Sequence, residues 1–387
     1  MYAEDVELSY RFRSHGYALK YVPNAWVRHY TYEHAGEVKP LQFTGSILGN
    51  SYIRLRYGEP RDILIGLMMY ALHFAAPEPF NGSRKALWKN LRKLAGNARH
   101  FLGGKGDSQA YFPLRGFDYE MVRDGAFWKI PELTYDGTLP TVSIITRTYQ
   151  GRDALLEQAI RSVFNQTYPT IELLVVEDGG DTQQALVEKM AAQAPQHISL
   201  RFIANPKQGR SAAGNTGLAN ARGQFMMFLD DDDLLFADHV EILAAPLLKD
   251  ATLSATYSLA FEVATALNDE KSSYVEKRFL THNLMRQEWD YTVLQHHNFI
   301  PIQAILFRRE LFEEHGGFDV NLDQLEDWNL WLRYGYRKQF KFIPKTTSCY
   351  CVPADPNVLA NRHQLLHTAY DKAKIRALRA LNKVNDQ

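Results

Sequence analysis

The stretch Phe225-Met-Met-Phe-Leu-Asp-Asp-Asp-Asp233 joins a short apolar run to four consecutive carboxylates. A short apolar run with polar residues at its end is typical of a buried strand. Four adjacent carboxylates repel one another unless water or a cation neutralises them. The stretch therefore predicts a buried strand that ends in a charged site.

Three more apolar, β-branched runs precede this one, at residues 142–147, 171–176 and 198–204. Helical apolar stripes separate the runs, at residues 153–164, 183–194 and 211–222. Strands that alternate with helices predict an α/β fold with a mixed, mainly parallel sheet flanked by helices. Ligands bind beyond the carboxyl ends of such strands. Polar clusters follow all four runs: Thr146-Arg-Thr-Tyr149, Glu177-Asp178, Asn205-Pro-Lys207 and Asp230–Asp233.

The composition excludes several classes of protein. Lys and Arg number 44 against 44 Asp and Glu, so the chain lacks the basic excess typical of nucleic-acid binders, and we expect no nucleic-acid partner. The two cysteines, Cys349 and Cys351, are too few for a disulfide framework or a four-ligand zinc site. The acidic start at Met1 is unlike a secretory signal, so we expect a cytoplasmic protein.

Residues 63–76 form the most apolar run of the chain. A span across a bilayer needs ~20 apolar residues, so we expect no transmembrane span here. A buried helix and an interfacial helix in peripheral contact with the inner face of the plasma membrane both remain open. A further apolar stripe over residues 363–384 predicts a C-terminal helix.

The sequence contains an internal echo. Ala3-Glu-Asp-Val-Glu-Leu-Ser-Tyr-Arg11 matches Leu325-Glu-Asp-Trp-Asn-Leu-Trp-Leu-Arg333 in pattern, and Lys20-Tyr-Val-Pro23 matches Lys341-Phe-Ile-Pro344. We therefore predict that residues 1–60 are the C-terminal remnant of a domain like the later one. A helical and irregular linker would follow at 61–138, with an exposed loop at 103–107, then the main domain at 139–352 and a closing helix at 353–387.

Three features of the sequence are candidates for chemistry. The carboxylates of Asp230–Asp233 are hard ligands suited to Mg²⁺ or Mn²⁺, although a solvated acidic turn is the alternative. Asp327 opens a helical segment and is suited to act as a general base, although it could serve only as a first-turn charge. Arg210 lies at a Gly-rich helix start whose backbone amides could hold phosphate oxygens.

The ordered blocks resemble the family 2 glycosyltransferases, which have the GT-A fold. The resemblance rests on Val142-Ser-Ile-Ile-Thr-Arg-Thr-Tyr-Gln150, Leu174-Val-Val-Glu-Asp-Gly-Gly180, the stretch from Gly209 to Asp233, Gly316-Gly-Phe-Asp319 and Glu326-Asp327-Trp328. It implies a metal-dependent, inverting transfer from a nucleotide-sugar donor to a hydroxyl of a glycan or lipid-linked glycan. A role in bacterial surface polysaccharide synthesis is the family expectation.

The resemblance also implies roles for single residues. Thr146 and Tyr149 would line the nucleoside pocket, and Asp178 would bind the base. Asp230 would meet the ribose or the metal, and Asp232 would bind Mn²⁺ or Mg²⁺ on the donor diphosphate. Asp327 would be the catalytic base. Glu326 and Trp328 are assigned to the acceptor side, with core packing left open for the tryptophans.

The sequence departs from the family pattern at two positions of this site. Arg147 stands where a Pro is usual, and Gly214 stands where an Arg is usual, so nearby Arg210 could replace a lost contact. The Gln-x-x-Arg-Trp block of processive synthases is also missing, which favours transfer of one or a few sugars. A degenerate module that binds nucleotide or glycan without turnover, and a sugar nucleotidyltransferase, remain the alternatives.

Overall fold

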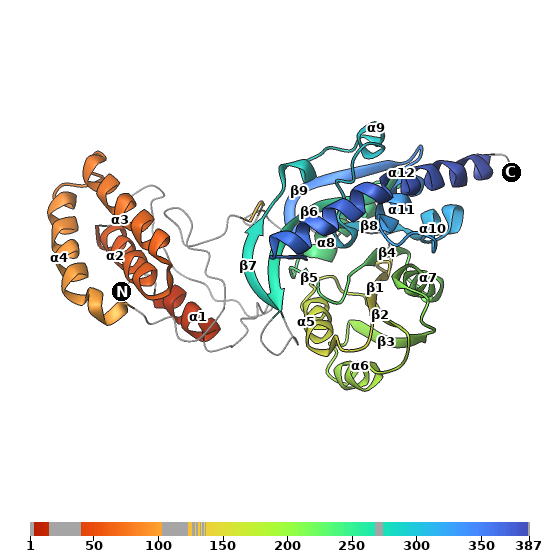
Figure 1. Cartoon of the computed structure of the whole chain (residues 1–387), viewed down its shortest axis with the longest axis horizontal. Helices are drawn as coiled ribbons and strands as arrows, with labels where there is room; N and C mark the ends of the chain where they lie inside the picture. Colours follow the sequence, from red (N-terminus) through yellow and green to blue (C-terminus); the bar gives the residue numbers. More distant parts are fainter. Residues whose placement is uncertain are drawn as a thin grey trace. The chain divides into compact units, whose positions relative to one another are not determined.

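The computed structural model describes residues 4–14, 40–102, 123–125, 128, 131, 133, 135, 137–267 and 274–385. The chain divides into two compact units, Met1–Val122 and Arg123–Gln387 (Figure 1). The division does not separate residue 60 from residue 61, and the origin of residues 1–60 as a domain remnant stays a prediction. The predicted loop at 103–107 and the echo strand at 20–23 lie outside the described residues.

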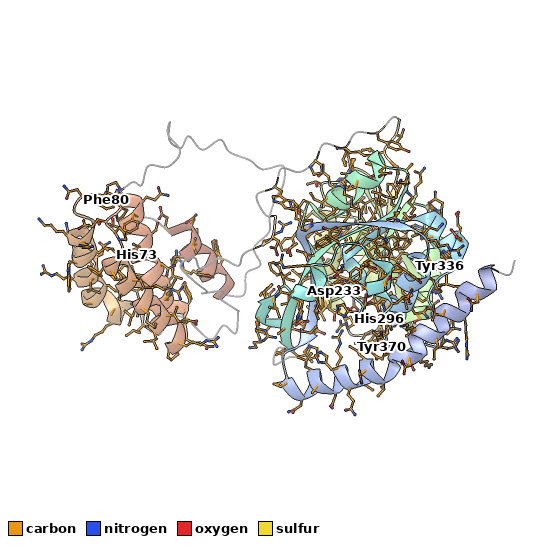
Figure 2. The ribbon with its side chains drawn as sticks, turned by 90° about the horizontal axis from the view of Figure 1, so that it is seen from above. His73, Phe80, Asp233, His296, Tyr336 and Tyr370 are labelled. Carbon is orange, nitrogen blue, oxygen red and sulfur yellow. The ribbon has the colours of Figure 1, made fainter. Side chains whose placement is uncertain are left out.

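The described part of the first unit is helical. Its helices are α1 (Glu4–Ser14), α2 (Pro40–Tyr57), α3 (Pro60–Ala75) and α4 (Ser83–Phe101). α2 packs against both α3 and α4, and the ring of Phe43 contacts those of His73 and Phe80, which are labelled in Figure 2. Among the described residues, no helix is both long enough and apolar enough to cross a bilayer.

The second unit is built on a mixed sheet with the strand order β3-β2-β1-β4-β8-β6-β9-β5, and β7 pairs with β6. The ladders that join β1, β2, β3 and β4 are parallel, as is the long ladder between β6 and β9. The strands are β1 (Val142–Thr148), β2 (Ile171–Asp178), β3 (Ile198–Asn205), β4 (Phe225–Phe228), β5 (Leu234–Leu235), β6 (Leu253–Leu267), β7 (Tyr274–Leu280), β8 (Ile305–Arg308) and β9 (Gln339–Pro353).

Helices cover the sheet, and the two faces of the sheet bury separate apolar cores. Ile144 of β1 enters one core and Ile145 the other, as the alternation of side chains along a strand requires. The helices of this unit are α5 (Asp153–Phe164), α6 (Gln184–Ala191), α7 (Arg210–Asn220), α8 (His239–Lys249), α9 (Tyr291–Leu294), α10 (Arg309–His315), α11 (Glu326–Tyr334) and α12 (Pro356–Asn385), with short 3₁₀ turns at Asn283–Met285 and Ile302–Ala304.

The predicted α/β fold class is confirmed. The strands and helices expected between residues 142 and 229 all form, with small shifts at their ends. The two copies of the internal echo are both helical, since α1 begins at Glu4 and α11 begins at Glu326. The C-terminal helix α12 is longer than predicted and packs along α11 (Figure 1).

Candidate active site

The four carboxylates Asp230–Asp233 lie directly beyond β4, as predicted. β4 pairs with β1 in parallel, so the residues that end β1 lie next to the acidic cluster. Two arginines from this neighbouring segment, Arg147 and Arg152, bind the cluster. The cluster is therefore neutralised in part by the chain itself.

Arg147 makes a two-pronged ion pair with Asp230. Its Nε and Nη2 donate to Oδ1 and Oδ2 of Asp230, both at 2.7 Å. Its Nη1 also donates to Oε1 of the buried Glu326, at 3.3 Å. Burial alone lowers the pKa of Arg147, but the carboxylates around it outweigh burial and raise the pKa. Arg147 thus stays charged and joins the end of β4 to the start of α11.

Gly214 makes room for this arginine. A Cβ at Gly214 would lie 2.6 Å from the ring of Phe318 and 3.4 Å from Cδ of Arg147. The guanidinium of Arg147 also lies 5.4 Å from the centre of the Phe318 ring. A side chain at position 214 would therefore have to displace the Phe318 ring, and it would contact Arg147. The two positions that depart from the family pattern, Arg147 and Gly214, are therefore neighbours. The positive charge is on β1, at Arg147, and not on α7, at position 214.

Arg152 binds the outer part of the cluster. Its Nη2 donates to Asp231 at 2.8 Å and to Oδ2 of Asp232 at 2.7 Å. The hydroxyl of Tyr274 also donates to Oδ2 of Asp232, at 3.2 Å. The guanidinium lies 5.4 Å and 5.7 Å from the ring centres of Tyr149 and Tyr274. The Asp232 side chain keeps 25% of its surface exposed.

The inner carboxylates are deeply buried. Asp231 accepts a hydrogen bond from the Thr148 hydroxyl at 2.7 Å, and burial raises its pKa to about 6 despite the arginine. Asp233 accepts only the backbone N–H of Cys351 among the described residues, and burial together with the other carboxylates raises its pKa well above the ordinary value. Its surroundings therefore favour the protonated form of Asp233. Both Cys349 and Cys351 are free thiols.

Asp327 lies at the start of α11. Its Oδ2 accepts a hydrogen bond from Nδ2 of Asn298 at 3.0 Å, and its Oδ1 accepts the backbone N–H of Trp328 at 2.7 Å. Burial, reinforced by the Glu326 carboxylate, raises its pKa to about 6. Leu325, the residue before α11, has a left-handed backbone with φ of 58°, which is uncommon outside glycine. The chain is thus held in a constrained turn where it presents this carboxylate.

Glu326 bridges two arginines and is buried. Besides Arg147 it binds Nη2 of Arg210 at 2.9 Å, and Arg210 also donates to the backbone carbonyl of Asp323. Arg210 remains about half exposed, so its guanidinium also faces solvent. The structure therefore brings Arg210, Arg147 and Asp230 together with the start of α11.

The other predicted nucleotide-site residues have different environments. Asp178 at the end of β2 accepts the backbone N–H groups of Gln208 and Gly209, so it holds the turn before α7. Tyr149 is exposed, whereas Thr146 is buried and its hydroxyl has no hydrogen-bond partner among the described residues. Asp178 and Tyr149 remain accessible to a ligand, and Thr146 lies beneath the surface.

Trp328 requires a correction to its assignment on the acceptor side. The residue is fully buried, its Nε1 donates to the carbonyl of Leu294 at 2.7 Å, and its ring packs on Tyr370 of α12. It cannot contact an acceptor in this arrangement. α11 is enclosed because α12 covers a side that the sequence pattern left open, and the alternative of core packing is the one observed.

Sequence reasoning missed the residues that hold the carboxylates in place: Arg147, Arg152, Asn298 and Tyr274. The sequence singled out Arg147 only as a departure from the family pattern, and it did not single out Arg152. Each of the four is separated from its carboxylate partner by at least 29 positions in the chain. Parallel pairing of β1 with β4 was the one signal that could have placed Arg147 near Asp230.

The residues present fit a divalent cation in part. Among the described residues no three His, Cys, Asp or Glu side chains form a metal-binding group, and both oxygens of Asp230 are bound to Arg147. The hydrogen bonds that the structure shows to the Asp232 carboxylate all reach Oδ2. Oδ1 is therefore available as one hard ligand. Mg²⁺ and Mn²⁺ suit such a site, because they bind through one or two carboxylates, phosphate oxygens and water.

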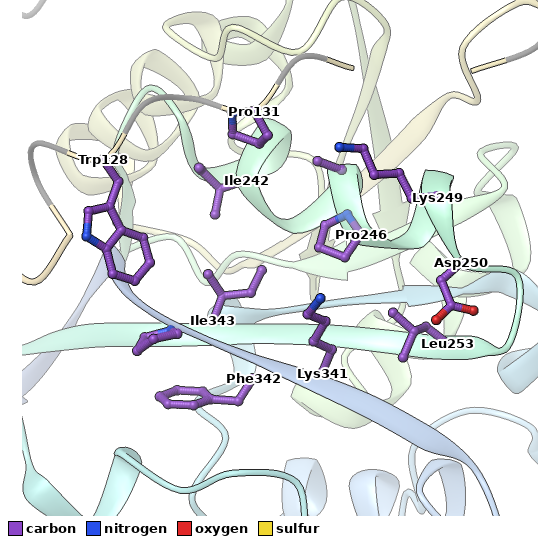
Figure 3. Close-up of a pocket in the computed structure, with 12 residues that line it drawn as sticks. Trp128, Pro131, Ile242, Pro246, Lys249, Asp250, Leu253, Lys341, Phe342 and Ile343 are labelled. Carbon is purple, nitrogen blue, oxygen red and sulfur yellow. The ribbon is translucent and has the colours of Figure 1, made fainter. Parts of the chain in front are cut away.

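A pocket of about 450 Å³ lies away from this cluster, against α8 and the first residues of β6 and β9 (Figure 3). Its lining is mainly apolar, with Trp128, Ile242, Pro246 and Phe342 among the side chains. β6 runs parallel to β4, since both pair antiparallel with β8. The beginning of β6 therefore lies at the other end of the strands from the carboxyl end of β4. The pocket carries none of the candidate catalytic groups.

Comparison with known proteins finds similarity to one family model and to several enzymes that build glycans. Residues 143–316 match the model of "Glycosyl transferase family 2". A chondroitin synthase of Pasteurella multocida is 24% identical over 213 residues, which cover 55% of this chain and 20% of that protein. A Campylobacter jejuni protein named GalNAc(5)-diNAcBac-PP-undecaprenol beta-1,3-glucosyltransferase is 34% identical over 105 residues, covering 27% of this chain and 34% of that protein.

This chain therefore spans a fifth to about a third of the length of these two relatives. Among solved structures, S. aureus TarS 1-349 in complex with UDP-GlcNAc aligns with a TM-score of 0.45 and 15% sequence identity. The alignment covers 57% of this chain and 60% of that one.

Proposed function

We propose that the chain, whose residues 143–316 match the model of glycosyl transferase family 2, transfers a sugar from a nucleoside-diphosphate donor to a hydroxyl of an acceptor. One observation carries the proposal. Asp327 is half-buried at the start of α11, and the residue before it, Glu326, is tied through Arg147 to Asp230 at the end of β4. A base candidate and an acidic donor-site candidate are thus held in one network.

In this proposal the base acts on the acceptor. Asp327 accepts the proton of the attacking hydroxyl, which requires the carboxylate form. The pKa of about 6 leaves the group largely ionised at neutral pH and closer to that of a useful base than an ordinary Asp. Asn298 and the backbone N–H of Trp328 each donate to one carboxylate oxygen of Asp327 and so orient the group, and the remaining lone pairs of an ionised carboxylate can accept the proton of the acceptor. A single displacement of this kind inverts the anomeric centre.

The donor site would be formed by the cluster beyond β4. Asp232 would hold Mn²⁺ or Mg²⁺ through its open oxygen, and the cation would neutralise charge on the leaving diphosphate. Arg210, which is half exposed, would bind a phosphate oxygen. Tyr149 would line the nucleoside pocket beside Asp178, and Thr146 would support that pocket from below. Asp230 stays paired with Arg147 and would meet the ribose only at its edge.

The acceptor is proposed to be a glycan or a lipid-linked glycan. The names of the two similar proteins support this, because one is a chondroitin synthase and the other carries an undecaprenol-linked acceptor in its name. They also support a place in surface polysaccharide synthesis. Glu326 remains a proposed neighbour of the acceptor, although its carboxylate is bound by two arginines.

A nucleotide-binding module without turnover is the second candidate. What favours it is that Asp230 and Asp232 are each already paired with an arginine. Turnover separates the two candidates. Incubation with UDP-, GDP-, dTDP- and CMP-sugars, Mn²⁺ and a mixed panel of oligosaccharide and polyprenyl-linked acceptors should release nucleoside diphosphate or monophosphate and yield glycosylated acceptor. Release of pyrophosphate in a separate incubation with nucleoside triphosphates and sugar 1-phosphates would instead indicate a nucleotidyltransferase, and no turnover in either incubation would support the binding module.

A further inference from the structure

The outward face of α3 is apolar from Leu64 to Leu72. Its exposed large side chains include Leu64 at 59%, Met68 at 61% and Leu72 at 57% of their full accessibility, and Leu67 and Ile65 lie beside them. The spacing of these residues is that of one side of a helix. The opposite side packs inward, where the hydroxyl of Tyr70 donates to the Leu87 carbonyl. Within the described part of the unit, nothing covers the outward stripe.

α4 is strongly basic and lies against the same region. It contains six Lys and Arg residues and no Asp or Glu: Arg84, Lys85, Lys89, Arg92, Lys93 and Arg99. Residues 40–102 as a whole carry nine Lys and Arg against three Asp and Glu, although the complete chain is neutral. The positive charge of the chain is therefore concentrated in this helical unit.

Trp88 links the basic helix to the apolar stripe. It is 58% exposed, and its ring centre lies 5.3 Å from that of Phe74 on α3. Arg84 and Arg92 stand one helical turn before and after it on α4. An exposed Trp between aliphatic side chains and cations is the combination that favours the interface of a bilayer, where the ring meets both acyl chains and headgroups.

We propose that α3 and α4 form a surface that docks on an anionic lipid bilayer. The aliphatic stripe and Trp88 enter the headgroup region, and the cations of α4 bind lipid phosphates. Charge complementarity selects this occupant, because an apolar stripe alone would fit any apolar partner, whereas the adjoining cations require an anionic one. A nucleic-acid backbone would match the cations but leave the stripe exposed. This inference concerns a different unit and does not depend on sugar transfer.

Vesicle sedimentation with the full chain tests the proposal. The protein should bind phosphatidylglycerol-rich vesicles, bind phosphatidylcholine vesicles weakly, and dissociate as salt is raised, because ions screen the cations. Lys85→Gln/Lys89→Gln/Arg92→Gln should weaken binding on the order of a hundredfold, at roughly one factor of five per cation. Leu67→Gln/Met68→Gln should weaken it about tenfold or more.

Matched controls use exposed residues of the second unit. Lys189→Gln/Lys372→Gln/Arg379→Gln removes the same charge, and Leu365→Gln/Ile375→Gln removes comparable apolar side chains, and neither should change vesicle binding. The proposal is wrong if the wild type does not bind anionic vesicles. It is also wrong if removal of the cations weakens vesicle binding while Leu67→Gln/Met68→Gln leaves it unchanged. It is also wrong if Leu67→Gln/Met68→Gln abolishes self-association of the chain in sedimentation velocity without affecting vesicle binding. In that case a second copy is the occupant.

Discussion

Arg147 and Arg152 both come from the segment at the end of β1, yet they bind the acidic cluster in different settings. Arg147 is buried, grips both oxygens of Asp230 and continues to Glu326. Arg152 is more accessible, lies between two tyrosine rings and binds one oxygen of Asp232. The first pair is a fixed part of the fold that connects β4 to α11. The second includes a contact with the partly exposed carboxylate of Asp232, for which a ligand or cation can compete.

The largest effect should come from a change at Asp327, which follows Glu326, a partner of Arg147. Asp327→Asn keeps the shape of the side chain and one of its two acceptor oxygens but removes the base, so kcat should fall by roughly 10²–10⁴. Donor binding, measured by calorimetry, should change little because Asp327 is not part of the acidic cluster. Turnover at the wild-type rate in this variant would remove Asp327 from the mechanism.

Matched variants test most directly whether the two arginines differ in their contribution to stability. Arg147→Met leaves Glu326 and Asp230 without their buried partner and should lower the free energy of unfolding by about 3–5 kcal/mol. Arg152→Met should cost less, because its partner Asp231, with a pKa of about 6, can take up a proton and become neutral. Urea unfolding of both variants at pH 6 measures the difference. Equal losses would mean that the two pairs do not differ as described.

A smaller effect is expected from pH. A carboxylate with a raised pKa is protonated, and inactive as a base, below that pKa. The rate should therefore rise as pH increases through about 6 and level off above it, and this limb should be absent in the residual activity of Asp327→Asn. An ordinary Asp would place the limb near 4. A wild-type limb near 4 would show that Asp327 is not perturbed in the working enzyme.

The sequence predicted the fold better than the site. Apolar periodicity located the strands of the parallel half, and their polar ends located Asp230 and Asp232, because both signals are local. The role of Arg147 was invisible, since it depends on Glu326 and on the space beside Gly214, far away in the chain. Trp328 was misplaced for a related reason. The apolar stripe of α11 shows which side of this helix is buried against the sheet. It does not show that α12 covers another side of the same helix.

The most direct test of the account is calorimetric titration of UDP, GDP, dTDP and CMP, each with and without Mn²⁺, into the wild type and Asp232→Ala. We predict that one nucleotide binds the wild type tightly only when Mn²⁺ is present, and that Asp232→Ala loses this dependence. Binding of the same strength in both proteins, or without any response to Mn²⁺, would contradict the assignment of a metal-dependent donor site to the cluster beyond β4.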